Sequence, residues 1–171
     1  MSKVIPGRYT AQMEGSFVVF IIGMRVNNFW ALHKWLPVFM AMNPMLQELY
    51  RNKDLGFLDA SFHLSWRGVS IVQYWRSFEQ LEAYARKGAV HMEAWRNFNK
   101  KVGTSGVVGI YHETYLIQEG QYECVYNNMP VAGLAKAGAH VPATGKEETA
   151  SRRLGRDGEP AVPTPPNPNL R

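Results

Sequence analysis

The segment from Trp75 to Trp95 constrains the fold of this chain more than any other. It joins the end of an apolar strand to two helices in succession. Ser77 and Gln80 have the spacing of a capping box, in which the serine hydroxyl accepts the amide N–H three residues later and the glutamine side chain reaches back. Gly88 then predicts the end of the first helix, since glycine is common just after a helix.

The second helix is expected to start at a histidine. His91, Trp95, Phe98 and Val102 follow one another at helical spacing, so they form one stripe. The imidazole of His91 therefore lies in line with the apolar face that packs against the rest of the fold. Two interpretations remain open: His91 is a core histidine that is hydrogen-bonded to a neighbour, or it is a catalytic or ligand-binding residue of a pocket.

The remaining apolar segments predict an α+β fold. Strands are expected at residues 16–26, 56–66, 69–75 and 107–118, and a helical region at 29–50 that bends at Pro37 and restarts at Asn43-Pro44. The resulting order β-α-β-β-α-β is the ferredoxin-like arrangement. Residues 121–127 are expected to add an extra C-terminal strand as the hairpin partner of 107–118, and residues 1–15 an irregular lead-in.

The composition changes after Pro130. Residues 131–171 are rich in Gly, Ala and Pro and contain no aromatic side chain, so they cannot bury enough apolar surface to fold alone. We therefore expect a folded domain at 1–130 and an extended tail at 131–171. The tail is expected either to be disordered or to lie over the domain, with Gly133-Leu134 as its anchor.

Charge and cysteine content limit the class of protein. The net charge of +5 is spread thinly over 171 residues, without the basic run of a nucleic-acid-binding arm, so no nucleic-acid partner is expected. The single cysteine, Cys124, cannot form an intrachain disulfide, which suits a reducing compartment. No signal peptide and no membrane span is visible. We expect a cytoplasmic protein with no membrane partner.

Several segments resemble known families. The strand-to-helix junction and the two helices resemble the dimeric α/β-barrel superfamily, which includes antibiotic-biosynthesis monooxygenases; the residues that carry this likeness are Trp75-Arg76-Ser77, Leu81, Tyr84 and His91. Residues 111–115 (YHETY) and 122–130 (YECVYNNMP) more closely resemble an uncharacterised bacterial family of monooxygenase-type proteins. The resemblance covers roughly residues 10–155 and implies a homodimer in which two sheets pack face to face.

Candidate site residues come from the same segments. His91, His112 and Glu113 are the candidate catalytic groups, since each can accept or donate a proton. His112 lies on one face of its expected strand, and Tyr111 and Glu113 lie on the other. An apolar small molecule would be bound by aromatic and methionine side chains, for which the candidates are Trp95, Trp30, Phe39, Met40 and Tyr111. No closely spaced cluster of ligands predicts a metal site.

Three functions remain open. The resemblance first implies a small oxidoreductase, similar to cofactor-independent monooxygenases, that acts on an apolar or aromatic small molecule. It also permits a haem-binding enzyme of the same fold, aldoxime dehydratase-like or haem-degrading, with His91 as the proximal ligand. The third alternative is a module that binds a hydrophobic ligand without catalysis.

Overall fold

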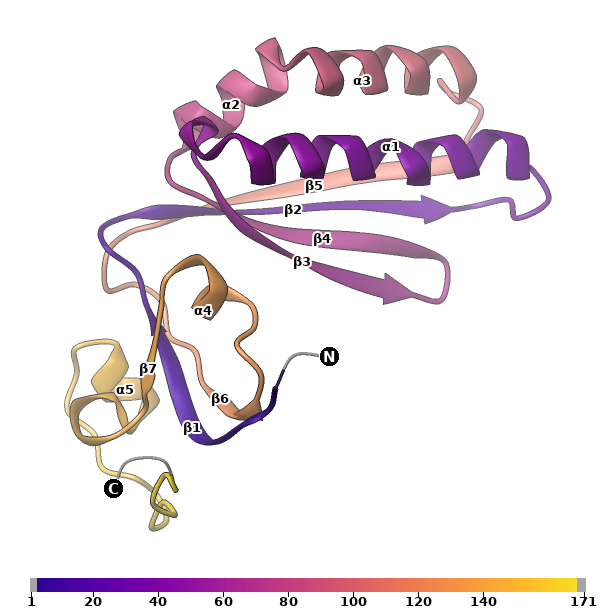
Figure 1. Ribbon diagram of the computed structural model, residues 1–171. Helices are drawn as coiled ribbons and strands as arrows, with labels where there is room; N and C mark the ends of the chain where they lie inside the picture. The colour runs from indigo at the N-terminus through magenta and orange to yellow at the C-terminus, as the bar shows by residue number, and fades with distance from the viewer. Residues whose placement is uncertain (1–2, 169–171) are drawn as a thin grey trace. The chain divides into compact units, whose positions relative to one another are not determined.

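The computed structural model describes residues 3–168 of the chain (Figure 1). These residues form two compact units. One consists of residues 18–115, and the other combines residues 3–17 with residues 116–168. The composition had predicted a boundary after residue 130, whereas the structure groups residues 116–130 with the tail and with the start of the chain.

The unit formed by residues 18–115 is built on a four-stranded sheet in the order β3-β4-β2-β5. Its strands are β2 (Phe17–Val26), β3 (Phe57–Ser65), β4 (Gly68–Trp75) and β5 (Val108–Ile117). β4 lies between β2 and β3 and pairs with both in antiparallel fashion. The three helices α1, α2 and α3 cover one face of this sheet (Figure 1). The predicted ferredoxin-like order is confirmed.

Helix α1 (Leu32–Arg51) is continuous and contains both Pro37 and Pro44. The predicted restart at Asn43-Pro44 is therefore wrong. A proline inside a helix removes one backbone hydrogen bond and strains the preceding turn. Here the apolar face of α1, which buries Met45 and Leu49 on the sheet, outweighs that loss.

Helices α2 (Phe78–Lys87) and α3 (Ala89–Lys101) follow β4 directly. Ser77 caps α2, because its hydroxyl accepts the backbone N–H of Gln80 at 3.3 Å. The Gln80 side chain does not return to Ser77 but points to the carbonyl oxygen of Asp54, 3.5 Å away. Gly88 ends α2 and precedes α3, as the sequence predicts. α3 begins two residues before His91, which places the imidazole in its first turn.

The core between helices and sheet is divided into two apolar clusters. The first gathers at the β4-to-α2 junction and consists of Val18, Leu49, Phe57, Trp75, Leu81 and Tyr84. The second lies toward the far end of β2 and consists of Met24, Val26, Val102 and Val108. The helices are therefore fastened to the sheet near both ends of β2, and the middle of the sheet lies between the two clusters.

The second unit contains a three-stranded sheet in the order β6-β1-β7. Its elements are β1 (Ile5–Gln12), β6 (Tyr126–Met129), α4 (Leu134–Ala137), β7 (Ala139–Pro142), a short 3-10 helix (Gly145–Glu147) and α5 (Ala150–Arg153). Another short 3-10 helix, Lys53–Leu55, belongs to the first unit. The expectation that the start of the chain is irregular is wrong, since β1 is the central strand.

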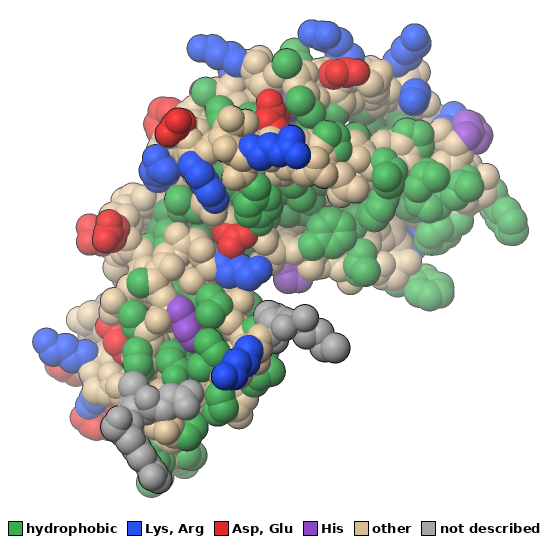
Figure 2. All heavy atoms as spheres, viewed as in Figure 1, with side chains coloured by type: hydrophobic (Ala, Val, Ile, Leu, Met, Phe, Trp, Pro, Cys, Tyr) green, Lys and Arg blue, Asp and Glu red, His purple; other side chains and the backbone are tan. Residues whose placement is uncertain are grey.

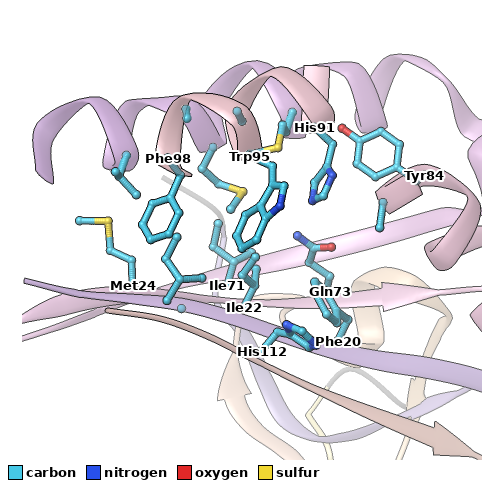
Figure 3. A pocket seen from close by; sticks show the side chains of 18 of the residues that line it. Phe20, Ile22, Met24, Ile71, Gln73, Tyr84, His91, Trp95, Phe98 and His112 are labelled. Atoms are coloured by element: carbon cyan, nitrogen blue, oxygen red, sulfur yellow. The ribbon is translucent and has the colours of Figure 1, made fainter. Parts of the chain in front are cut away.

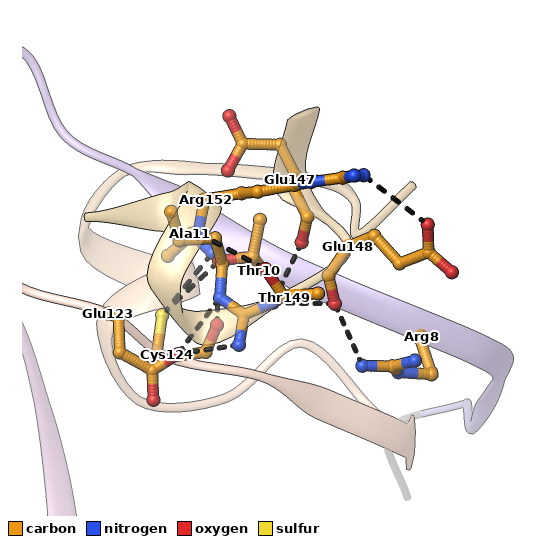
Figure 4. Close-up of polar contacts among 10 residues, drawn as sticks. Arg8, Thr10, Ala11, Glu123, Cys124, Glu147, Glu148, Thr149 and Arg152 are labelled. Carbon is orange, nitrogen blue, oxygen red and sulfur yellow. Dashed lines mark hydrogen bonds and ion pairs between the residues drawn. The ribbon is translucent and has the colours of Figure 1, made fainter. Parts of the chain in front are cut away.

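The predicted hairpin between residues 107–118 and 121–127 is also wrong. β6 pairs with β1, where Ile5 lies opposite Met129. The segment before β6 is tied to β1 as well, because the Thr10 hydroxyl donates to the carbonyl oxygen of Cys124 at 2.7 Å and the Ala11 N–H donates to its Sγ at 3.4 Å (Figure 4). These partners lie more than a hundred residues apart, so the local turn signal at Glu119-Gly120 could not reveal them.

The described part of the tail is held at several points. Leu134 is buried, at the position expected from the sequence. Asn167 is a second anchor, because its Oδ1 accepts the backbone N–H of Arg8 at 2.6 Å and its Nδ2 donates to the Arg8 carbonyl at 2.7 Å. The Asn167 side chain fills the space where a Cβ of Gly7 would lie. Gly7 also has a φ of +101°, so this contact depends on glycine at residue 7. An ion pair between Arg153 and Glu123, at 2.6 Å, ties α5 to the same unit.

His140 of β7 is the titratable group most affected by this packing. Its ring stacks on Tyr9 with a centroid distance of 4.5 Å, and its Nε2 is buried without a hydrogen-bond partner among the described residues. Burial lowers the pKa of His140 from its usual value of 6.5. The unfolded chain therefore takes up the proton at a higher pH than the folded chain does.

His140→Phe is expected to make stability less sensitive to acid. The stabilising effect of a neutral His140 is present above about pH 6.5 and is lost as the pH falls below it. Phenylalanine keeps the stack on Tyr9 but cannot ionise. Urea unfolding at pH 7.5 and pH 5.5 should show a smaller loss of free energy in this variant than in the wild type. His33→Gln, at an exposed site, should keep the wild-type loss; an equal loss in all three proteins would contradict the prediction.

Candidate functional site

A cavity of about 830 Å³ lies between the three helices and the middle of the sheet. Its floor is formed by the sheet, through Phe20, Ile22, Ile71, Gln73 and His112, and its roof by α3, through His91, Trp95 and Phe98 (Figure 3). Members of the two apolar clusters close it toward the ends of β2, among them Trp75 and Met24. The cavity occupies the part of the core that neither cluster fills.

Most of the lining is aliphatic, aromatic or methionine. Four polar lining side chains, Glu82, Arg86, Asn97 and Lys101, come from the helices, and Arg86 and Glu82 form an ion pair of 3.0 Å in which both side chains are exposed. The side chains with polar atoms that Figure 3 labels are Gln73, Tyr84, His91 and His112. An apolar ligand thus meets a small number of polar groups, as is typical of small-molecule sites.

His91 points from α3 toward the sheet (Figure 3). Its Nδ1 is buried and has no hydrogen-bond partner among the described residues. Its ring packs against Tyr84, with a centroid distance of 5.9 Å. A core histidine of purely structural role would have its buried nitrogen satisfied, since an unpaired buried polar atom is costly. The fold leaves this nitrogen unsatisfied, and His91 remains a candidate site residue.

Tyr84 forms the wall next to His91 and is held in place by α1. Its hydroxyl donates to the Glu48 carboxylate at 2.9 Å. Burial, together with this hydrogen bond to a carboxylate, raises the pKa of Tyr84 well above its usual value. Tyr84 is therefore a neutral, fixed wall and not a base near neutral pH.

Gln73 is a site residue that the sequence analysis missed. It lies on β4 between Ile71 and Trp75, on the face that lines the cavity, and it is 4% exposed. Its Oε1 accepts the indole N–H of Trp75 at 2.9 Å. A signal for it was present in the sequence, because an amide at residue 73 interrupts an apolar series with a period of two.

The structure brings together four of the residues singled out from the sequence. His91, Trp95, Phe39 and His112 all line the cavity. The ring of His112 lies 5.6 Å from that of Phe20 on the neighbouring strand, and its side chain is exposed to solvent on one side. The stripe predicted for α3 therefore does face the sheet, and one face of β5 contributes to the floor.

Four other candidates lie outside the cavity lining. Tyr111 and Glu113 occupy the opposite face of β5, where Tyr111 covers Gly23 and Glu113 accepts a hydrogen bond from the Tyr115 hydroxyl at 2.7 Å. Strand alternation explains this, since His112 takes the inner face. Met40 is 52% exposed on α1.

Trp30 precedes α1, which begins at Leu32, so helical spacing did not apply to it. It is 96% exposed. Figure 2 shows apolar side chains, in green, gathered over the end of this unit where α1 starts and β3 turns into β4. Trp30 therefore belongs to the surface of the unit and not to the pocket wall.

Within residues 3–168, no group of three or more His, Cys, Asp or Glu side chains is placed to hold a metal ion. None of the helices described over this range combines the length and the apolar character that crossing a bilayer requires.

Residues 17–134 match the sequence profile of the family described as Monooxygenase af470-like. The chain belongs to this family. Monooxygenase af470 of Aspergillus fumigatus is 31% identical over 153 residues, which cover 75% of this chain and 53% of that protein. The chain thus spans about half the length of this curated relative. The resemblance to monooxygenase families seen in the sequence is confirmed.

Two solved structures show the same fold. An aldoxime dehydratase in complex with butyraldoxime matches with a TM-score of 0.63 at 13% identity, over 81% of this chain and 40% of that one. A second aldoxime dehydratase matches with a TM-score of 0.61 at 16% identity, over 78% of this chain and 40% of that one. At such identities the likeness of this af470-like chain to the dehydratases concerns the fold alone.

Proposed function

We propose that this af470-like protein is an oxidoreductase of the monooxygenase type that oxidises a small apolar or aromatic molecule inside the cavity. The observation that carries the proposal is the His91 imidazole, which points from α3 into a largely apolar cavity of about 830 Å³ (Figure 3). Membership of a monooxygenase family supports the same reaction class.

The chemistry requires one base and a dry cavity. The His91 imidazole removes a proton from an acidic CH₂ group of the substrate, and the carbanion combines with dioxygen to form a hydroperoxide after His91 returns the proton. Loss of the second C–H proton then breaks the O–O bond and releases water. The sum is R–CH₂–R′ + O₂ → R–CO–R′ + H₂O, in which dioxygen is the oxidant. The largely apolar walls disfavour water next to the carbanion.

Oxygen uptake tests this proposal. With enolisable aromatic ketones as trial substrates, the wild type should consume dioxygen, and His91→Gln should lower the rate about 100-fold or more, because general bases contribute about 10²–10⁴-fold. His63→Gln is the matched control, since His63 is exposed and does not line the cavity. A His91→Gln variant as active as the wild type would refute the role of His91. Ligand binding without any oxygen uptake by the wild type would favour the non-catalytic module.

A second candidate function is haem binding, and it is supported by the position of the His91 imidazole in the cavity lining. A neutral imidazole can ligate iron. Lys101 lines the same cavity, and its ammonium group would pair with a carboxylate of the haem. His91 would be the ligand that holds the iron.

Hemin titration separates this candidate from the first. On the haem hypothesis, added hemin gives a shifted Soret band in the wild type and His91→Ala loses the shift, while His63→Ala keeps it. An unshifted band in the wild type, or the same shifted band in His91→Ala, would remove His91 as a haem ligand. Oxygen uptake by protein that contains no haem would favour the cofactor-independent reaction.

The protein is also proposed to form a homodimer through the sheet face that points away from α1, α2 and α3. This face carries Val19, Ile21, Val72, Tyr111 and Tyr115, on strands that alternate with the cavity-lining positions. Tyr111 and Tyr115 are each 47% exposed. A second copy of the sheet would remove this apolar surface from water.

Light scattering coupled to size-exclusion chromatography should give the mass of two chains for the wild type. Tyr111→Lys should shift the protein toward the mass of one chain, because it places a charge in the interface. Ala83→Lys changes an exposed position of α2 and should leave the mass unchanged. A wild type with the mass of a single chain would contradict the proposed dimer.

A further inference from the structure

Gln73 is an amide buried where the sheet is otherwise apolar. It lies opposite Phe20 of β2 and Ala60 of β3, and its neighbours along the inner face of β4 are Ile71 and Trp75. Placing an amide there costs free energy unless its polar atoms are hydrogen-bonded. Trp75 satisfies only the carbonyl oxygen of this side chain.

The orientation of the amide follows from its bond to Trp75. An indole N–H can only donate, so the atom of Gln73 that faces it, at 2.9 Å, is the oxygen Oε1. The NH₂ group must then point away from Trp75. In Figure 3 it points into the cavity, beneath Trp95 and His91. The hydrogen bond to Trp75 uses only the oxygen of the amide and leaves this nitrogen directed at the cavity.

Two of the polar groups of the cavity therefore face each other from opposite walls. The Gln73 NH₂ is a donor on the floor, and the His91 imidazole lies on the roof. We propose that Gln73 binds an oxygen atom of the substrate, and that the substrate is an enolisable ketone or a phenol carried on an apolar frame. This inference rests on the proposed function, because it assigns the substrate class of the same cavity.

In an enolisable ketone, His91 acts on the carbon next to the carbonyl group and Gln73 on the carbonyl oxygen; in a phenol, both act at the hydroxyl group. When His91 removes the proton, the negative charge moves onto the oxygen that Gln73 holds. A hydrogen bond to an enolate or phenolate is stronger than one to a neutral carbonyl, so Gln73 stabilises the charged state more than the bound substrate. The apolar walls around the pair increase that difference.

The same arrangement disfavours the binding of hydrocarbons in the cavity. A ligand without oxygen would offer no acceptor to the Gln73 NH₂ and would leave this donor unpaired. Sites built around a hydrogen bond reject analogues that lack the bonding atom, whereas purely apolar pockets discriminate weakly. The structure therefore predicts selection by the presence of oxygen and not by size.

Binding of a matched probe pair tests this selection. 2-Tetralone and tetralin share a bicyclic frame and differ by one carbonyl oxygen. Calorimetry should show at least about tenfold tighter binding of 2-tetralone by the wild type, the value of one buried hydrogen bond. Gln73→Met keeps the length of the side chain but removes the donor, and it should bring the ratio of the two dissociation constants near one. Ile71→Val, on the same strand face, should change both constants alike.

A second variant controls for the possibility that Gln73→Met is destabilised. Gln73→Met leaves the buried indole N–H of Trp75 unpaired, whereas Gln73→Met combined with Trp75→Phe removes both partners of that bond. The double variant should also lose the preference for 2-tetralone. Retention of the preference in either variant would overturn the inference, and so would a wild type that binds both probes equally or binds neither.

Proton exchange under nitrogen distinguishes this inference from the proposed function. In D₂O the wild type should accelerate deuterium incorporation at C1 of 2-tetralone, with Gln73→Met slowed at least about tenfold and His91→Gln reduced to the rate in buffer. Selective binding through Gln73 without exchange or oxygen uptake would refute the oxidoreductase and leave Gln73 as a binding determinant. Oxygen uptake that depends on His91, with a probe ratio unaffected by Gln73→Met, would refute the role of Gln73 alone.

Discussion

The packing of Trp75 against its aromatic neighbours holds one end of the helical layer on the sheet. Trp75 and Phe57 are completely buried and meet edge to face at 5.5 Å, and Tyr84 tilts against the same indole at 5.8 Å. Buried aromatic side chains contribute a large apolar area and specific pair geometry. At the other end Met24 and Val102 supply a smaller aliphatic contact. With both ends fastened, the middle of the sheet need not be filled, and a cavity can persist there without loss of the fold.

Trp75 also links this core to the site. Its ring belongs to the first cluster, while its N–H fixes the amide of Gln73 with the donor group toward the cavity. The chain that follows places the opposite wall, because the Ser77 cap starts α2 and Gly88 ends it. His91 then falls in the first turn of α3, above the sheet. Both walls of the proposed site are thus set by about twenty consecutive residues and their packing.

The sequence predicted what depends on local periodicity. The strands around Val18, Ile71 and Ile110 were found because they are runs of apolar and β-branched residues, and the stripe through His91 and Trp95 was found from its helical spacing. The pairing of segments that are distant in the sequence produces no such local pattern. β6 pairs with β1, and Asn167 clamps Arg8, through partners that no short window contains. The sequence also could not tell which apolar residues face a cavity, since Met40 and Phe39 both fit a helical face and only Phe39 lines it.

The chemistry of the site depends on the few polar groups in the cavity and not on the fold, which aldoxime dehydratases share at 13–16% identity. An imidazole can act as a base or as a metal ligand, so His91 alone does not distinguish between the two candidate functions. The amide of Gln73 does help to distinguish the oxidoreductase from the haem protein. A donor fixed on the wall facing the base is what a reaction needs when it moves negative charge onto an oxygen. Because Trp75 holds this donor in place before any ligand arrives, its orientation requires no reorganisation when the charge develops, and the geometry favours proton abstraction next to a carbonyl or in a phenol.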